Sequence, residues 1–193
     1  TYDAAAHGAS GSCVGVAIDP AAAGSSLSLD GTFTSVPGGT ANWSFTGGAN
    51  YKNQSGSVAI TIGKADAVCS ITGYSGSYDA APHGASGSCV GVAADATAAG
   101  SVLSLGATFV NVPGGSANWS FTGGINYKNQ SGSVAIAISK ADAVCTIHGY
   151  TGTYDAAAHG ATGGCSGVDN GAAAGGSLDL GASFTNVPGG SAH

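Results

Sequence analysis

The sequence predicts an all-β protein built from tandem copies of one small β-sandwich, and three observations lead to this fold class. The phrase Tyr-Asp-Ala-Ala recurs every 76 residues, beginning at Tyr2, Tyr78 and Tyr154. Within each copy, β-branched residues alternate with small ones over short stretches, which is typical of half-buried strands. The 35 glycines fall largely between these stretches, where they favour turns, and no long stretch has a helical period.

The repeat defines the domain organisation. When residues 1–76 are laid over residues 77–152 without gaps, 17 of the 76 pairs differ and 59 are identical. A third copy begins at residue 153 and lacks one residue near Asp169–Gly176. The natural seam is Lys-Ala-Asp-Ala, at 64–67 and again at 140–143. We therefore expect a first repeat, 1–65, that lacks its first strand, a complete second repeat, 66–141, and a third repeat, 142–193, truncated after about two-thirds.

Each copy contains its own predicted core and strands. Val58, Ile60 and Ile62 alternate with smaller residues, and Val134, Ile136 and Ile138 repeat this pattern, which predicts a half-buried strand in each copy. The predicted core residues are Trp43, Phe45, Trp119, Phe121, Val134, Ile136 and Ile138. Further strands are predicted at 68–74, 83–92, 102–105 and 108–112, with one helical turn at 96–100. Six or seven short strands separated by turns are typical of a small sandwich.

The cysteines are predicted to stabilise this small core. A domain of this size buries only about 60% of its unfolded surface, so a covalent link contributes a large share of its stability. A hairpin that turns near Asp79 places Cys69 opposite Cys89, and the period then pairs Cys145 with Cys165. Closing a loop of this length contributes about 3 kcal/mol in the chain-entropy model.

The fifth cysteine, Cys13, has no partner by this rule. We expect it to pair with a cysteine outside the given residues or in a neighbouring chain. The alternative pairing, Cys13 with Cys69, would span the seam. Cys-x-x-Cys is absent from the sequence, so no metal site is expected. Persistent disulfides indicate an oxidising compartment outside the cytosol.

Composition excludes several classes of partner. The formal net charge is −6, with four Lys or Arg residues in all, so no basic surface is available for nucleic acid. No apolar run approaches the roughly 18 residues of a membrane-spanning helix, so no membrane insertion is expected in this segment. We expect no cofactor. The near-absence of charge favours close approach of neighbouring chains, so the expected partner is the protein itself.

One recurring pair of residue types resembles catalytic machinery. His7, His83 and His159 each follow an aspartate by four residues, and serines are abundant nearby. No Gly-x-Ser-x-Gly elbow is present, and the sequence has no glutamate for paired-carboxylate chemistry. We interpret Tyr78, Asp79 and His83 as a turn closed by hydrogen bonds and predict that the protein is not an enzyme.

Two surface features bear on glycans. Asn-x-Ser sequons, which are possible glycosylation sites, occur at Asn42, Asn53, Asn118 and Asn129. Alternation turns Asn42 and Asn118 outward beside the tryptophans. Tyr51 and Tyr127, if exposed, would form a carbohydrate platform, so a glycan is a possible partner. A single aromatic residue per repeat, however, more often packs on its own loop.

Three phrases resemble a known family. They are Gly-Tyr-Ser-Gly-Ser-Tyr-Asp-Ala-Ala-Pro-His-Gly-Ala-Ser-Gly (73–87), Phe-Val-Asn-Val-Pro-Gly-Gly-Ser-Ala-Asn-Trp-Ser-Phe-Thr-Gly (109–123) and Asn-Tyr-Lys-Asn-Gln-Ser-Gly-Ser-Val-Ala-Ile (126–136), and the copy closes with Ser-Lys-Ala-Asp. They resemble the MBG family, the "mostly bacterial" immunoglobulin-like repeats of large secreted surface proteins. The resemblance covers essentially all residues. Cys69 and Cys89 depart from it, because such repeats usually carry Thr, Val or Ala there.

The resemblance implies immunoglobulin-like domains at a bacterial cell surface or outside the cell, without catalytic activity. Together with the repeat, it predicts a structural segment of a disulfide-stapled stalk or self-assembled filament. The alternative is an adhesin module that binds carbohydrate or a host or cell-surface ligand.

Overall fold

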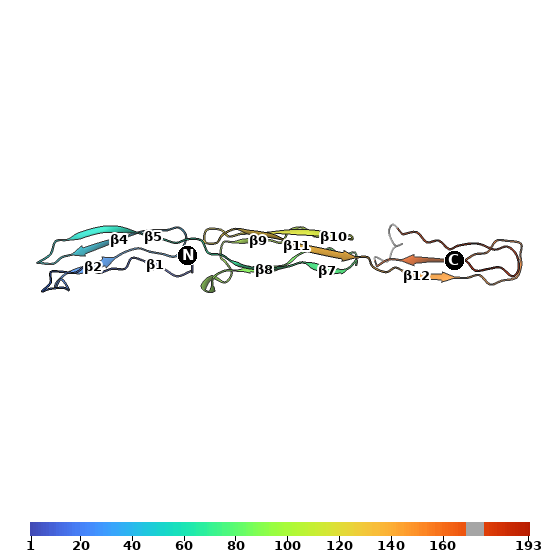
Figure 1. Ribbon diagram of the computed structural model, residues 1–193, viewed down its shortest axis with the longest axis horizontal. Coiled ribbons are helices and arrows are strands. Elements are labelled where there is room, and N and C mark those ends of the chain that lie inside the picture. The colour runs from blue at the N-terminus through green and yellow to red at the C-terminus, as the bar shows by residue number, and fades with distance from the viewer. Residues whose placement is uncertain (169–175) are drawn as a thin grey trace. The chain divides into compact units, whose positions relative to one another are not determined.

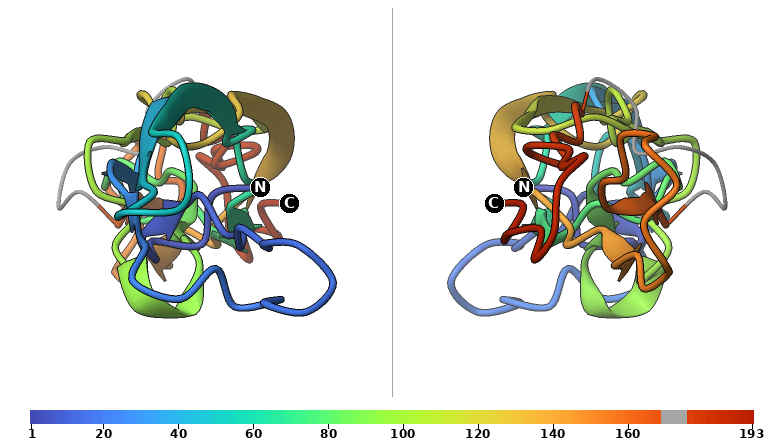
Figure 2. Two further views of the ribbon diagram at one scale, coloured as in Figure 1. Left: turned by 90° about the vertical axis from the view of Figure 1, so that its left-hand side faces the viewer. Right: turned by 90° about the vertical axis from the view of Figure 1, so that its right-hand side faces the viewer.

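The computed structural model describes residues 1–168 and 176–193, and these residues are almost entirely strands, turns and loops (Figures 1 and 2). One 3-10 turn, η1 (Ala93–Asp95), is the helical element among them. The all-β prediction is therefore confirmed, and the several sheets are consistent with a β-sandwich. No helix among the described residues is long and apolar enough to cross a membrane.

The described chain divides into two compact units. The first unit comprises Thr1–Thr72, Ser86–Gly106 and Asn118–Val134, and the second comprises Gly73–Ala85, Ala107–Ala117 and Ala135–His193. The sequence-based division into three repeats remains a prediction, and its names are kept here for the three stretches of sequence.

The first repeat carries a three-stranded antiparallel sheet. Its order is β2-β4-β5, and a separate pair joins β1 to β3. In the β4–β5 register Trp43 lies opposite Gly56, whose missing side chain makes room for the indole. The strands are β1 (His7–Gly8), β2 (Ser26–Leu29), β3 (Thr32–Phe33), β4 (Gly38–Thr46) and β5 (Gln54–Thr61).

The second repeat carries two sheets, the pair β6-β8 and the four-stranded sheet β7-β11-β10-β9. In the β6–β8 register Cys69 faces Cys89, which is the register that the sequence predicts. Strand β7 runs parallel to β11, with Tyr74 beside Ile136. The strands are β6 (Val68–Thr72), β7 (Tyr74–Ser77), β8 (Ser86–Val90), β9 (Val102–Ser104), β10 (Gly114–Thr122) and β11 (Gln130–Ser139).

Four predicted elements of this repeat need correction. The single strand expected at 68–74 breaks at Gly73 into β6 and β7, because at Gly73 the chain passes so close to the Ala135 carbonyl that a side chain would not fit. The strand expected at 83–92 shortens to β8, and 108–112 contributes only the bridge between His83 and Phe109. The helical turn lies at Ala93–Asp95, just before the predicted 96–100.

The third repeat has two described strands, β12 (Val144–His148) and β13 (Thr162–Ser166), which pair antiparallel with Cys145 opposite Cys165. All five residues of β12 are exposed. Among the described residues these two strands form a sheet of their own, and a two-stranded sheet alone is only marginally stable in water.

The main hydrophobic cluster lies in the first unit. Its buried members come from both the first and the second repeat, together with the seam between them: Tyr2, Ile62, Ala65, Ala67, Ala98, Phe121 and Tyr127. Of the predicted core residues, Phe45, Phe121, Ile136 and Ile138 are buried, whereas Trp43, Trp119 and Val134 are half-buried. The indoles lie across glycines of the neighbouring strand, which leaves part of each ring open to solvent.

Candidate functional site

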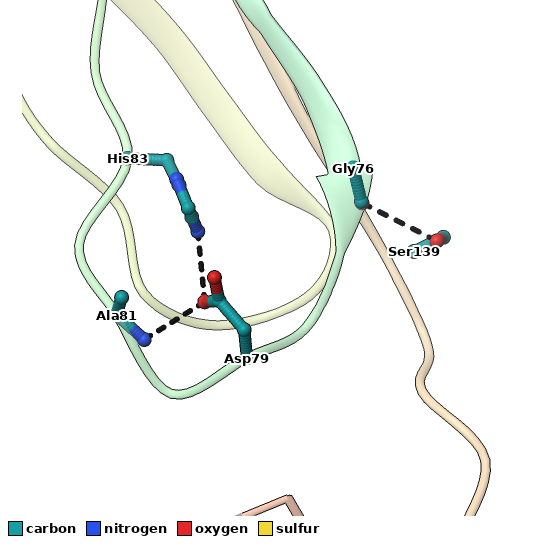
Figure 3. Close-up of polar contacts among 5 residues, drawn as sticks. All are labelled: Gly76, Asp79, Ala81, His83 and Ser139. Atoms are coloured by element: carbon teal, nitrogen blue, oxygen red, sulfur yellow. Dashed lines mark hydrogen bonds and ion pairs between the residues drawn. The ribbon is translucent and has the colours of Figure 1, made fainter.

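The predicted Tyr78–Asp79–His83 turn is held by the aspartate carboxylate. Asp79 Oδ1 accepts a hydrogen bond from the Ala81 backbone N–H at 2.9 Å and lies 2.8 Å from His83 Nε2 (Figure 3). The His83 ring stacks on Tyr74, with 3.8 Å between the ring centroids. The same Asp–His contact recurs at 2.8 Å between Asp3 and His7 and between Asp155 and His159.

The serine required for a Ser/His/Asp arrangement is not joined to this pair. Ser139 donates a hydrogen bond to the Gly76 carbonyl at 3.3 Å, and Figure 3 shows this contact beside the strand, apart from the Asp79–His83 contact. Within the described ranges no serine hydroxyl forms a hydrogen bond with His83. Among the same residues, no three His, Cys or Asp side chains gather closely enough to hold a metal ion.

The hydrogen bonds of this turn should make the stability of the protein depend on pH in the acid range. Two hydrogen bonds lower the pKa of Asp79 below its usual 3.8. The backbone N–H of Ala81 has the larger effect and His83 the smaller one. A lowered folded-state pKa stabilises the protein above pH 3.8, and this contribution is lost as the pH falls through the folded-state pKa. We expect urea midpoints to fall in this acid range, and to fall less steeply for Asp79→Asn. Equal slopes for both proteins would contradict the assignment.

The structure contains two disulfides, Cys69–Cys89 and Cys145–Cys165, and Cys13 is a free thiol. Cys69 and Cys89 pack against the main hydrophobic cluster, whereas Cys145 is exposed on β12. Two disulfides fit an oxidising environment.

The sequon asparagines are all exposed. Asn42 and Asn118 lie on β4 and β10. Asn53 and Asn129 lie in loops, where the side-chain oxygen of each accepts a hydrogen bond from a glycine N–H at 3.0 Å.

Of the two alternatives for the tyrosines, an exposed carbohydrate platform or a ring packed on its own loop, the platform is wrong for Tyr127. This residue is 0% exposed and Tyr51 is half-buried, so Tyr127 presents no ring face to solvent. The hydroxyl of each tyrosine instead donates a hydrogen bond to an aspartate of its own repeat, Tyr127 to Asp95 at 2.8 Å and Tyr51 to Asp19 at 2.9 Å.

The first and second repeats meet at a site in the first unit that we call the joint. Tyr2 of the first repeat packs edge-on against Tyr127 of the second, with 5.4 Å between ring centroids. The Tyr2 hydroxyl donates a hydrogen bond to Asp95 Oδ2 at 3.1 Å, so both tyrosines share one carboxylate. Val36 N–H donates to Asn126 Oδ1 at 3.1 Å. The joint therefore combines an aromatic contact with directional hydrogen bonds.

The seam residues complete the joint. The backbone of Ala65 exchanges hydrogen bonds of 2.9 Å with Asn126 and Lys128, on either side of Tyr127. Lys64 Nζ donates to the Gly124 carbonyl at 2.7 Å, and the Lys128 ammonium lies 3.0 Å from the Asp66 carboxylate. These hydrogen bonds fix the backbone of the seam, so the linker between the repeats is an ordered part of the first unit.

Electrostatics at the joint follow from burial. Burial and then the hydrogen bond to Asp95 raise the pKa of Tyr127 from its usual 10.0 to about 12. Hydrogen bonds, first from the Ala99 backbone N–H and then from Tyr127, lower the pKa of Asp95. At neutral pH the joint therefore holds a neutral tyrosine pair around one carboxylate.

Alkaline titration should weaken the joint. Because the folded-state pKa of Tyr127 is raised, its contribution to stability is complete below pH 10 and is lost as the pH rises towards 12. The free energy of unfolding should fall by ~1.4 kcal/mol per pH unit in this window. Urea denaturation measures it, with Cys13→Ser as background to prevent thiol exchange. Tyr127→Phe should make this slope shallower, leaving the part that Tyr2 and Tyr51 contribute through their own raised pKa values, and an unchanged slope would contradict the assignment.

Sequence reasoning did not find the joint as a site. Tyr2 belongs to the recurrent Tyr-Asp-Ala-Ala phrase, but its side chain acts on residues of the next repeat. Its link to Asp95 joins residues 93 positions apart. One sequence pattern pointed towards the joint: Tyr, Asp, Asn and Lys recur at matching positions of successive copies. This recurrence indicates that these residues share a role, but it does not show that residues of one copy contact those of the next.

The chain matches no protein-family model, no curated protein and no solved structure. The assignment of function therefore rests on the residues and on their geometry.

Proposed function

We propose that this chain is a structural, non-catalytic segment of an extracellular bacterial stalk or filament, in which immunoglobulin-like repeats of the MBG type are joined end to end. The observation that carries the proposal is the shared core at the joint, where Tyr2 and Tyr127 belong to one buried cluster together with the seam alanines. A flexible linker needs no such core, because it leaves its backbone groups to water.

The remaining features support the same role. Each Asp–His pair closes a turn, and among the described residues no serine hydroxyl forms a hydrogen bond with His83, which favours a scaffold over an enzyme. The disulfide Cys69–Cys89 fastens the first strand of the second repeat to β8. In a filament under tension, that link limits how far the repeat extends when its core opens.

Static light scattering across a concentration series tests the proposal. Because the chain is proposed to associate end to end, the average mass should rise with concentration above the 18.1 kDa of one chain. Electron microscopy of the same samples should show linear particles. A mass of one chain at every concentration would contradict the filament.

The variant Tyr51→Ala tests which surface joins the chains. Tyr51 is the first-repeat counterpart of Tyr127, and no tyrosine of a preceding repeat packs on it within the described residues. Its replacement should reduce association while leaving the joint between the first and second repeats intact. Unchanged association would show that chains meet through another surface.

A further inference from the structure

The disulfide Cys69–Cys89 lies beside two segments that meet at the joint. The seam, 64–67, leads directly into β6, and β8 leads directly into residues 91–99, which carry Asp95. In the β6–β8 register Cys69 faces Cys89, and one further residue pair separates the disulfide from both segments. The disulfide is therefore a covalent link between the seam side and the Asp95 side of the joint.

Residues 91–99 position the hydroxyl groups of both tyrosines of the joint. The Val92 backbone N–H donates a hydrogen bond to the Tyr127 hydroxyl at 3.2 Å. Asp95 Oδ2 accepts hydrogen bonds from Tyr127 at 2.8 Å and from Tyr2 at 3.1 Å. Hydrogen bonds weaken steeply as their geometry departs from linear, so the joint depends on where residues 91–99 lie.

The seam is held by a different segment. The Ala67 carbonyl accepts a hydrogen bond from Gln130 Nε2 at 2.8 Å, and the backbone of Ala65 forms hydrogen bonds on either side of Tyr127. In the part of the chain that the structure describes, no hydrogen bond joins the seam directly to residues 91–99. These two segments are therefore held together by the tyrosine contacts and by the pair β6–β8, which connects their ends.

The pair β6–β8, which we call the ribbon, depends on its disulfide for packing. Three residues of the ribbon are half-buried, Cys69, Ile71 and Cys89, and the others are exposed. Both cysteines pack against the main hydrophobic cluster, to which Tyr2 and Tyr127 belong. A two-stranded ribbon is only marginally stable by itself. The disulfide therefore links the two strands and also holds the ribbon on the core of the joint.

The end of the ribbon beside the joint has little other packing. Val68 and Val90 face each other at this end and are 69% and 46% exposed, so burial of their side chains contributes little. Opening the disulfide therefore lets the ribbon fray from this end, which frees residues 91–99 to move away from the seam.

We infer that the redox state of Cys69–Cys89 controls the stiffness of the joint. With the disulfide closed, residues 91–99 stay in contact with Tyr2 and Tyr127, and the first and second repeats share one core. With the disulfide reduced, the ribbon frays and these contacts loosen, although the seam still connects the repeats. This inference rests on the proposed function, because it makes the rigidity of the stalk depend on oxidising conditions outside the cell.

Reduction takes two electrons from a dithiol. One thiolate of the dithiol attacks Sγ of Cys89, a mixed disulfide forms, and Cys69 leaves as a thiolate. The second thiol of the reagent then loses its proton and displaces Sγ of Cys89, so the reagent becomes a cyclic disulfide. The two protons of the dithiol end on Cys69 and Cys89. Attack on Cys69 gives the same products, and a disulfide oxidant reverses the sequence.

A variant of the 193-residue chain isolates this disulfide. Cys13→Ser combined with Cys145→Ala and Cys165→Ala leaves Cys69–Cys89, so a dithiol acts on this bond alone. The matched control adds Cys69→Ala and Cys89→Ala to the same variant, which leaves the dithiol no disulfide to reduce.

Amide hydrogen exchange, measured by nuclear magnetic resonance before and after reduction, compares the joint with the β4–β5 hairpin of the first repeat. Ala65 and Val92 report on the joint, since their N–H groups bond to Asn126 and to Tyr127. Losing the disulfide destabilises the whole first unit, so exchange of the hairpin amides also accelerates. We expect the acceleration at Ala65 and Val92 to be about tenfold greater, because these amides open with the joint. The dithiol should change nothing in the control.

Titration of Tyr127 gives a second readout. Burial and then the hydrogen bond to Asp95 raise its pKa to about 12 in the closed form, and a loosened joint should return the pKa towards 10.0. Ultraviolet absorbance of tyrosinate follows the titration, and the difference from Tyr127→Phe isolates this residue.

Three outcomes separate this inference from the proposed function. If reduction accelerates exchange at Ala65 and Val92 only as much as in the hairpin, the disulfide stabilises the unit as a whole and the inference is wrong, whereas association in light scattering would still support the stalk. Unchanged exchange after reduction would also overturn it. If the joint loosens as expected but the oxidised chain keeps a single-chain mass at every concentration, the filament is rejected and redox control of the joint stands.

Discussion

Replacing Tyr127 with alanine should lower the free energy of unfolding of the first unit by about 4 kcal/mol, which is typical of removing a large buried aromatic side chain. The substitution removes the ring that packs against Tyr2 and a hydroxyl that donates a hydrogen bond to Asp95 at 2.8 Å. Urea denaturation followed by tryptophan fluorescence measures the effect, because both tryptophans lie in the first unit.

Tyr51→Ala is the matched control for that substitution. Tyr51 makes the corresponding hydrogen bond to Asp19 but is half-buried and has no counterpart of Tyr2 packed against it in the described residues. We expect it to lower the free energy of unfolding by roughly half as much, because less area leaves water on folding. If the two variants lowered the free energy of unfolding equally, the contacts of Tyr127 at the joint would add nothing to the stability of the protein.

Removing the disulfide of the second repeat should produce the next largest effect. The variant Cys69→Ala with Cys89→Ala opens a loop between cysteines 20 residues apart, and the chain-entropy model gives a loss of about 3 kcal/mol. The same tryptophan signal measures it. The loss is a large share of the stability expected for a small domain.

The control is the equivalent change in the third repeat, Cys145→Ala with Cys165→Ala. That disulfide also spans 20 residues but lies in the second unit, which contains no tryptophan. The transition reported by tryptophan should not move. If the two double variants shifted this transition equally, the disulfides would not act locally on the unit that contains them.

Local sequence patterns predicted much of the fold because they act over short distances. Alternation located β11 and β5, and the spacing of Cys69 and Cys89 about the turn at Asp79 gave their register. The break at Gly73 was missed because it depends on the carbonyl of Ala135, which is distant in sequence. Predicted burial of Trp119 was too high because the indole lies across Gly132 near the surface.

The candidate site was harder to predict because each of its parts also has a role within its own repeat. The sequence favoured packing of Tyr127 on its own loop, but nothing in the repeat itself indicates that Tyr2 covers it. The identical sequences 7–17 and 83–93 differ in structure for the same reason. A strand of this kind forms only when its neighbour supplies hydrogen bonds and a face to pack against.

The central claim is that successive repeats share one core through the joint, and a double-mutant cycle tests it most directly. Tyr2→Ala, Tyr127→Ala and the double variant are compared by urea denaturation of the first unit. Because the two rings are in contact, their losses should fail to add, with a coupling of about 1 kcal/mol. Losses that add to within about 0.3 kcal/mol would contradict the shared core, since distant and independent sites behave in that way.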